Sequence, residues 1–228
     1  MEYFFYNVLD STMTEADRLL SMGHTSFCVI ADTQTAGRGK PGRSWHDEKG
    51  GSLLISIAVP LERRPEEYSF AAGLAVINML KKNCGLECSL KWVNDVYCRN
   101  RKLCGILCEQ KLKDGKAYMI AGIGINVLEK AFPEGLDATS VVIENPSAAP
   151  APRSLAEPLA EEFLAACRLP FGEILAVWDD KLYMKGRQAA IKSGNTLYSG
   201  VVDGIDAGGR LLLRGGKETF ALSSGTFI

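Results

Sequence analysis

The chain of 228 residues has few of the features that mark metal-binding or disulfide-stabilised proteins. It contains only two histidines, His24 and His46, and its seven cysteines include no Cys-x-x-Cys pair. An odd number of cysteines without this spacing predicts neither a disulfide framework nor a zinc site. We therefore expect free thiols, which are typical of a reducing compartment.

Long hydrophobic runs and a strong charge of one sign are also missing. No apolar run reaches the roughly 20 residues that a membrane-spanning helix needs. The first residues, Met1 to Tyr6, lack the positive segment and the apolar core of a signal peptide. The net charge is -1 and the basic residues form no long stripe, so we expect no nucleic-acid partner. These absences favour a cytoplasmic protein that binds neither membranes nor nucleic acid.

Positive charge is instead concentrated in a glycine-rich loop, Gly-Arg-Gly-Lys-Pro-Gly-Arg-Ser-Trp at 37–45. Glycines let the backbone approach a ligand, and arginine and lysine bind phosphate or carboxylate. A P-loop would have to open a helix, but the next apolar run, Ser52 to Val59, has the composition of a strand. Taken alone, the loop is equally compatible with a solvated basic turn.

Four further motifs accompany this loop. They are Asp10-Ser11-Thr12, Lys91-Trp92-Val93-Asn94-Asp95, Arg101-Lys102-Leu103-Cys104-Gly105-Ile106-Leu107, and Gly122-Ile123-Gly124-Ile125-Asn126-Val127. The last one lacks the third glycine of a Rossmann dinucleotide fingerprint, which excludes a Rossmann dehydrogenase.

In this order, the motifs resemble the catalytic core of biotin protein ligases. That family has a Gly-Arg-Gly-Arg-x-Gly-Arg-x-Trp loop, then Lys-Trp-Pro-Asn-Asp, then Lys-Leu-x-Gly-Ile-Leu. The resemblance implies ATP and biotin as substrates with Mg²⁺. Biotin would first be activated as biotinyl-AMP and then transferred to a lysine of a biotin carboxyl carrier protein of the acetyl-CoA carboxylase type. Related ligases often form homodimers, but the sequence leaves the oligomeric state open.

The resemblance assigns catalytic roles to Lys102, Arg38 and Asp95. An ammonium at Lys102 suits a reaction that brings a carboxylate against a polyanionic nucleotide, although without the motif a lysine here is more typical of a hairpin tip. Asp95 is the expected Mg²⁺ ligand, because Mg²⁺ often combines one or two carboxylates with substrate phosphates. An Asx-type turn is the structural alternative for Asp95.

The remaining expected site residues divide between the two substrates. The biotin-binding set is Ser11, Thr12, Gln34, Arg38, Gly39, Lys40, Lys102 and Gly105. The ATP-binding set is Arg38, Lys40, Arg43, Trp45, Lys91, Asn94 and Asn126. Hydroxyls at Ser11 and Thr12 could pair with a ureido ring, but they could also cap the helix that follows, and both roles are compatible. Trp45 could instead be a core aromatic.

Three positions depart from the family pattern. Lys40 replaces an arginine, Val93 replaces a proline, and Met13 replaces the asparagine that usually follows Ser-Thr. Lys40 keeps the positive charge but lacks the planar, bidentate fork of arginine.

Hydrophobic patterning predicts a mixed fold. Helices are expected at Thr14–Ser21, Pro65–Lys82, Ser154–Cys167 and Gly172–Tyr183, the third with a Ser154/Glu157 capping box. Strands are expected at Phe27–Ala31, Ser52–Val59, Ser89–Val93, Val93–Cys98, Leu103–Gln110 and Ala117–Val127. The expected fold class is α+β, with a mixed, largely antiparallel sheet and flanking helices. The resemblance implies a core like that of class II aminoacyl-tRNA synthetases.

A change of pattern after Gly186 predicts two domains. Short strands separated by glycine-rich turns fill the rest of the chain, as in a small β-barrel. We therefore expect a catalytic domain at 1–185 and an SH3-like domain at 186–228. Because Asp10-Ser11-Thr12 begins so near the start, we expect a dedicated ligase without a DNA-binding domain or repressor function. A lipoate or octanoate ligase and a non-catalytic binding module are the alternatives.

Overall fold

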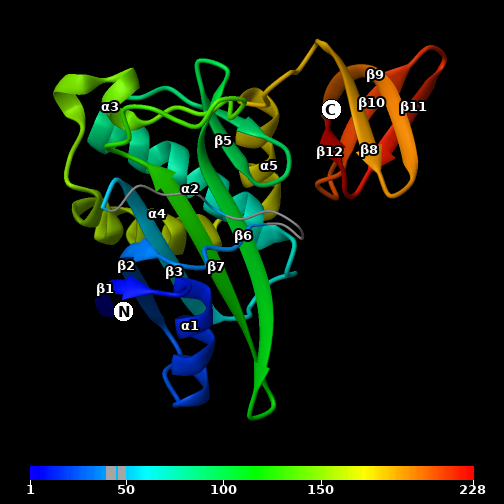
Figure 1. Cartoon of the computed structure of the whole chain (residues 1–228). Helices are drawn as coiled ribbons and strands as arrows, with labels where there is room; N and C mark the ends of the chain where they lie inside the picture. Colours follow the sequence, from blue (N-terminus) through cyan, green and yellow to red (C-terminus); the bar gives the residue numbers. More distant parts are fainter. Residues whose placement is uncertain (40–44, 46–49) are drawn as a thin grey trace.

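The computed structural model describes residues 1–39, 45 and 50–228, which form two sheets flanked by helices (Figure 1). The larger sheet has the strand order β1-β2-β3-β7-β6-β5-β4. These strands are β1 (Glu2–Leu9), β2 (Phe27–Gln34), β3 (Ser52–Pro60), β4 (Ser89–Lys91), β5 (Asp95–Cys98), β6 (Arg101–Lys113) and β7 (Lys116–Asn126). Among the strands of this sheet that the structure describes, only β1 and β2 pair in parallel. The expected α+β class with a largely antiparallel sheet is confirmed.

Helices cover both faces of this sheet. They are α1 (Thr12–Ser21), α2 (Glu67–Cys84), α3 (Val141–Glu144), α4 (Ala156–Arg168) and α5 (Phe171–Asp180). In β7, Met119, Ala121 and Ile123 pack into the core that contains α2 and α4, whereas Tyr118 and Ile120 pack against α1. Alternate residues of a strand point to opposite faces, so Gly122 and Gly124 lie on the α1 face.

Tight turns set the register of the central strands. Asp114 and Gly115 join β6 to β7 as a hairpin, with the positive φ values of 48° and 74° that a two-residue turn of this kind requires. The turn between β5 and β6 falls at Arg99 and Asn100, which adopt the left-handed conformation. The strand expected to reach Val93 ends at Lys91, and the Trp92–Val93 peptide bond is cis.

Two local predictions were wrong. The sequence patterns gave no element before Thr14, but Glu2–Leu9 forms the edge strand β1; its half-exposed aromatic residues do not alternate clearly. The Ser154/Glu157 capping box does not form, since Ser154 Oγ donates to the Ala151 carbonyl and α4 begins after a 3₁₀ turn at Pro152–Leu155. The prolines before α4 favour that turn over a capped helix start.

The C-terminal residues form a separate five-stranded antiparallel sheet in the order β11-β10-β9-β8-β12. Its strands are β8 (Gln188–Ser193), β9 (Thr196–Ile205), β10 (Leu211–Gly215), β11 (Glu218–Leu222) and β12 (Thr226–Phe227). Among the described residues, β11 and β12 remain unpaired edges, so the expected closure into a barrel is not seen. Trp92 Nε1 donates to the Gly209 carbonyl at 3.0 Å and ties this sheet to the larger one.

In the part of the chain that the structure describes, no helix is long and apolar enough to cross a membrane.

Candidate active site

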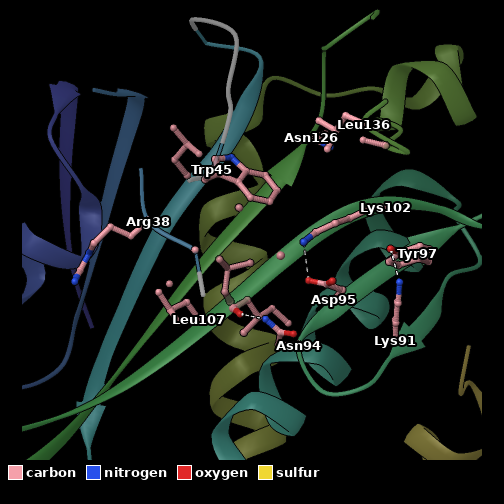
Figure 2. Close-up of a pocket in the computed structure, with 18 of the residues that line it drawn as sticks. Arg38, Trp45, Lys91, Asn94, Asp95, Tyr97, Lys102, Leu107, Asn126 and Leu136 are labelled. Carbon is pink, nitrogen blue, oxygen red and sulfur yellow. Dashed lines mark hydrogen bonds and ion pairs between the residues drawn. The ribbon is translucent and has the colours of Figure 1, made fainter. Parts of the chain in front are cut away.

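A cavity of about 350 Å³ lies on the α1 face of the larger sheet. Its lining comes from α1, from the strands β2 to β7, from the segment after β7, and from β12. Figure 2 shows Lys102, Asp95 and Trp45 directed into the same space. Segments far apart in the sequence therefore meet at one site.

Glycines leave the space for this cavity, and the indole of Trp45 packs against Gly105 and Gly124. A Cβ atom at Gly124 would lie 2.6 Å from Trp45 Cε2, and one at Gly105 would lie 2.8 Å from Trp45 Cζ3. At Gly122 a Cβ would lie 2.7 Å from Met13 Sδ. Side chains at these positions would fill the space, which explains why the strands carry glycine there despite its low strand preference. Trp45 is half-buried against the floor of the cavity.

Lys102 and Asp95 form an ion pair in the cavity. Lys102 Nζ lies 2.7 Å from Asp95 Oδ1, and the side chains are 30% and 18% exposed. The pair forms because β5 and β6 are adjacent antiparallel strands with Asp95 opposite Gly105. Lys102 Nζ also lies 5.9 Å from the centroid of the Trp45 ring. A cation, a carboxylate and an aromatic surface thus meet in one place.

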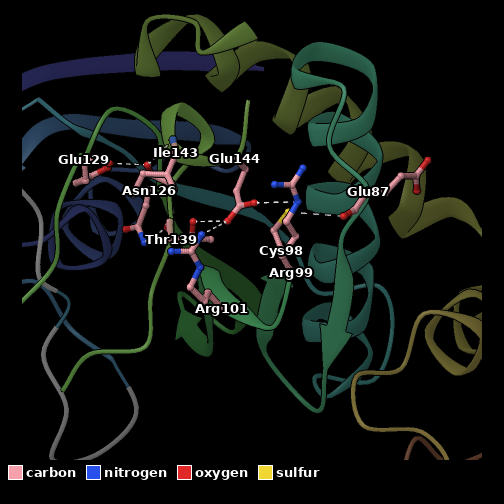
Figure 3. A network of polar contacts seen from close by, with 10 residues as sticks. Glu87, Cys98, Arg99, Arg101, Asn126, Glu129, Thr139, Ile143 and Glu144 are labelled. Carbon is pink, nitrogen blue, oxygen red and sulfur yellow. Dashed lines mark hydrogen bonds and ion pairs between the residues drawn. The ribbon is translucent and has the colours of Figure 1, made fainter. Parts of the chain in front are cut away.

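The backbone of Lys102 is held by a segment that the sequence motifs did not include. Lys102 N–H donates to the Asp137 carbonyl at 3.1 Å, and Thr139 N–H donates to the Lys102 carbonyl at 2.8 Å. The buried carboxylate of Glu144 accepts hydrogen bonds from Thr139 Oγ1 at 2.5 Å and Arg101 Nη2 at 2.8 Å (Figure 3). Glu144 therefore holds both Arg101, the residue before Lys102, and Thr139, which binds the Lys102 backbone.

Another part of the cavity lining belongs to a small group of neutral polar residues around Thr12 and Gln34. Gln34 Oε1 accepts hydrogen bonds from Thr12 N at 2.7 Å and from Thr12 Oγ1 at 3.1 Å, and Ser56 Oγ donates to Thr12 Oγ1 at 2.8 Å. Ser11 Oγ accepts from Met13 N at 3.3 Å as the N-cap of α1. The expected capping role of Ser11 is confirmed, and Thr12 is fixed by bonds on both sides.

Lys91 is part of the cavity wall, where the larger sheet and the C-terminal sheet meet. Its Nζ donates to Tyr97 Oη at 2.9 Å and is 5.3 Å from the centroid of the Phe227 ring. The Tyr97 and Tyr183 rings are within 4.6 and 5.7 Å of the same nitrogen. Aromatic faces attract an ammonium group, so these rings hold Lys91 beside the cavity. Phe227 shows that the C-terminal sheet contributes to the lining.

The expected asparagines take part in backbone contacts around the cavity. Asn94 Nδ2 donates to the Ile106 carbonyl at 2.8 Å and joins β5 to β6. Asn126 Nδ2 donates to the Thr139 carbonyl at 2.9 Å, next to the contact with Lys102. Both residues line the cavity, as does Gly39.

Arg38 does not join Lys102 and Asp95. Arg38 belongs to the cavity lining, but its Nη1 lies 3.3 Å from Glu109 Oε1, and the side chain points away from Lys102 (Figure 2). A role at the carboxylate therefore requires this side chain to leave Glu109. Lys40 and Arg43, which belong to the same expected set, lie outside the described residues.

No group of three or more histidine, cysteine, aspartate or glutamate side chains suited to a metal is present in the described ranges. Asp95 is one carboxylate facing the cavity. This donor set fits a Mg²⁺ ion that takes most of its ligands from phosphates and water, and it does not fit an all-protein cage.

Comparison with known proteins places the chain in a family. Residues 5–126 match the model of the biotin/lipoate A/B protein ligase family, which is more than half of the chain. The chain belongs to this family. The biotin--[acetyl-CoA-carboxylase] ligase of Mycobacterium tuberculosis is 31% identical over 211 residues, with 88% of this chain and 77% of that protein aligned. The resemblance inferred from the motifs is confirmed.

Other members of the ligase family extend the comparison. The bifunctional ligase/repressor BirA of Bacillus subtilis is 34% identical over 140 residues, and the alignment spans 58% of this chain and 43% of that protein. The fold is similar to a biotin protein ligase from Aquifex aeolicus in complex with biotin and ATP, with a TM-score of 0.87 and 24% identity. That similarity covers 100% of this chain and 97% of the other.

Several residues of this ligase site were not found from the sequence. The motifs did not indicate Glu144, Asp137 or Phe227, because each acts through a contact between distant segments. Gly122 and Gly124 were part of a motif, but the Met13 and Trp45 contacts that require glycine there come from the tertiary structure.

Proposed function

We propose that this family member is a biotin protein ligase that uses ATP. The observation that carries the proposal is the Lys102–Asp95 pair, which lies in a cavity with neutral hydrogen-bonding groups at Thr12 and Gln34 on another side. An acid with a polar, uncharged ring can place its ring at the neutral end and its carboxylate near Lys102. The names of the relatives support biotin as that acid.

The first step would join the two substrates. A carboxylate oxygen of biotin attacks the α-phosphorus of ATP, the bond to the β-phosphate oxygen breaks, and pyrophosphate leaves. Negative charge gathers on the α-phosphoryl oxygens, and the ammonium of Lys102 offsets it where water is largely excluded. Lys102 must exchange its contact with Asp95 for substrate oxygens, so the ion pair would be a resting arrangement.

The second step would transfer the biotinyl group. The amine of an acceptor lysine, after losing its proton, attacks the acyl carbon of biotinyl-AMP, and AMP leaves with the bonding electrons. We propose a biotin carboxyl carrier protein domain of an acetyl-CoA carboxylase as the acceptor, which the names of the relatives support.

The other assignments follow from the same reaction. Biotin would be contacted by Ser11, Thr12, Gln34, Gly39 and Gly105. ATP would be contacted by Arg43, Trp45, Lys91, Asn94 and Asn126. The side chains of Arg38 and Lys40 would contact both substrates. Asp95 would hold Mg²⁺, which neutralises phosphate charge when it is bound.

We also propose a division into domains at 1–185 and 186–228, the second SH3-like. The separate C-terminal sheet supports this division. The free state of all seven cysteines supports a cytoplasmic location.

A homodimer is the oligomeric state that we propose. Strand β1 is an edge of the larger sheet and exposes Phe5 and Val8, which are 52% and 54% accessible. Unpaired edges of this kind can extend a sheet across two chains. We expect sedimentation analysis to give a dimer, and Phe5→Lys with Val8→Lys to shift it to monomer. A monomer at all concentrations would contradict the proposal.

The function is tested by mass spectrometry after incubation of the protein with Mg-ATP and either biotin or lipoate. Biotinyl-AMP is the expected product. Formation of lipoyl-AMP alone would identify a lipoate-type ligase. The absence of an adenylate with either acid, from protein that still binds biotin, would identify a binding module.

A further inference from the structure

Two cysteines outside the cavity face each other across neighbouring strands. In the β4–β5 pair, Ser89 lies opposite Tyr97 and Leu90 lies opposite Val96. Continuing this antiparallel register by one residue places Cys88 opposite Cys98. Both side chains belong to the same buried core, so they lie on the same face of the sheet.

The surroundings of Cys98 support this placement of the two thiols. For each of the Cys88 and Cys98 thiols, the other thiol is the largest single influence on its pKa. Cys98 Sγ also lies 3.7 Å from the carbonyl oxygen of Glu87, the residue joined to Cys88 (Figure 3). Residues directly opposite in an antiparallel pair have Cα atoms about 4.5–5.5 Å apart, within the range of about 4.4–6.8 Å that a disulfide needs.

We propose that Cys88 and Cys98 form a redox-active pair, which a peroxide converts into a disulfide across β4 and β5. No step of ligation uses these thiols. The disulfide would close the segment 88–98, which carries Lys91, Asn94 and Asp95 on its way through the cavity wall.

The chemistry requires only hydrogen peroxide as the oxidant. The Cys98 thiolate attacks one peroxide oxygen, the O–O bond breaks, and the hydroxide that leaves takes up a proton to become water. The Cys88 sulfur then attacks the resulting sulfenic acid, an S–S bond forms, and a second water leaves. In total, two thiols and one peroxide give one disulfide and two waters.

The surroundings select Cys98 as the thiol that reacts first. The neighbouring Cys88 thiol lowers the pKa of Cys98, whereas the Cys98 thiol and burial raise the pKa of Cys88. Burial raises the pKa of Cys84 to about 11 and those of Cys108 and Cys167 to about 12. Thiolate is the reactive form, so the thiol with the lowered pKa is favoured.

Both thiols are buried, so a small oxidant would reach them when the start of β4 opens. β4 is the outer strand of the larger sheet at this side, and Cys88 immediately precedes it. The flanking side chains of Glu87 and Arg99 are 66% and 76% exposed. Opening the start of an edge strand disturbs fewer contacts than opening the sheet centre.

The test is a peptide map of the whole protein after peroxide treatment. Reduced protein is exposed to hydrogen peroxide, its remaining thiols are alkylated in denaturant, and it is digested with trypsin without a reductant. Cleavage after Lys82, Lys91 and Arg99 would leave peptides 83–91 and 92–99. We expect these two joined, with a mass lower by two hydrogen atoms than their sum, and separated again by dithiothreitol.

Cys84 provides a matched control, because it lies on the same peptide as Cys88. Cys84→Ser is expected to keep the link, whereas Cys88→Ser and Cys98→Ser are expected to abolish it. In Cys88→Ser, the sulfenic acid at Cys98 should be trapped by dimedone. The proposal is overturned if Cys88 and Cys98 of the unchanged protein are both recovered alkylated, or if the link persists in Cys88→Ser and disappears in Cys84→Ser.

Thermal unfolding gives an independent readout. The oxidised protein should unfold on the order of 5 °C higher than the reduced one, because the crosslink restricts the unfolded chain. The same treatment should leave the unfolding temperature of Cys98→Ser unchanged. An equal shift in both proteins would also overturn the proposal.

Discussion

Lys102→Ala is expected to form biotinyl-AMP about 10³-fold more slowly than the unchanged protein. Lys102 Nζ is 2.7 Å from Asp95 and faces the cavity, so its removal takes a positive charge from the place where phosphoryl charge would develop. Removing one such group typically costs about 10²–10³ in rate, and more where it contacts a transferred phosphoryl group. Single-turnover formation of biotinyl-AMP from biotin and ATP measures this effect.

Lys116→Ala is the matched control for this variant. Lys116 is the first residue of β7 and lies at the exposed hairpin that joins β6 to β7. It does not belong to the cavity lining. Its rate should equal that of the unchanged protein. An unaltered rate in Lys102→Ala, with the protein folded by circular dichroism, would remove Lys102 from the mechanism.

Gly124→Val is expected to weaken binding of ATP by roughly 10- to 100-fold. A Cβ at this position would lie 2.6 Å from Trp45 Cε2, so the indole would have to leave the floor of the cavity. Overpacking of this kind costs about 1–3 kcal/mol, and about 1.4 kcal/mol corresponds to a tenfold change in affinity. Isothermal titration calorimetry of the protein with ATP, in the presence of biotin, measures the change.

Gly172→Ala tests whether the effect of Gly124→Val depends on the cavity. Gly172 lies in α5, and a Cβ there meets no atom within 4 Å. Alanine in a helix is favoured over glycine by roughly 1 kcal/mol, so this variant should be slightly more stable and bind ATP normally. Normal ATP affinity in Gly124→Val would mean that Trp45 and Gly124 do not shape the nucleotide site.

Most of the architecture could be predicted from local patterns. The richness of Ser52–Val59 in Ile, Leu and Val, and the apolar run Ala117–Val127, indicated strands that the structure contains. Element ends shifted by a few residues, as for α2, which begins at Glu67 and continues to Cys84. Edge strand β1 was missed because half-exposed aromatic residues give no regular pattern.

The motifs also predicted which residues would lie in one site, but not which contacts each side chain would make. Lys102 and Asp95 come together as expected, and Thr12 contacts Gln34. Arg38 has the loop position that the motif suggested, yet its guanidinium pairs with Glu109 on β6. A charge on a long side chain takes the nearest opposite charge, and the sequence does not show which one is near.

The sequence by itself determined the fold class, the family, and the residue types available for the chemistry, because short-range periodicity and ordered motifs are written along the chain. The tertiary structure decided the contacts between distant segments. Glu144 orders the segment that holds Lys102, Phe227 brings the C-terminal sheet to Lys91, and Cys88 faces Cys98. Such contacts depend on strand order and register, which are settled only when the whole sheet packs against its helices.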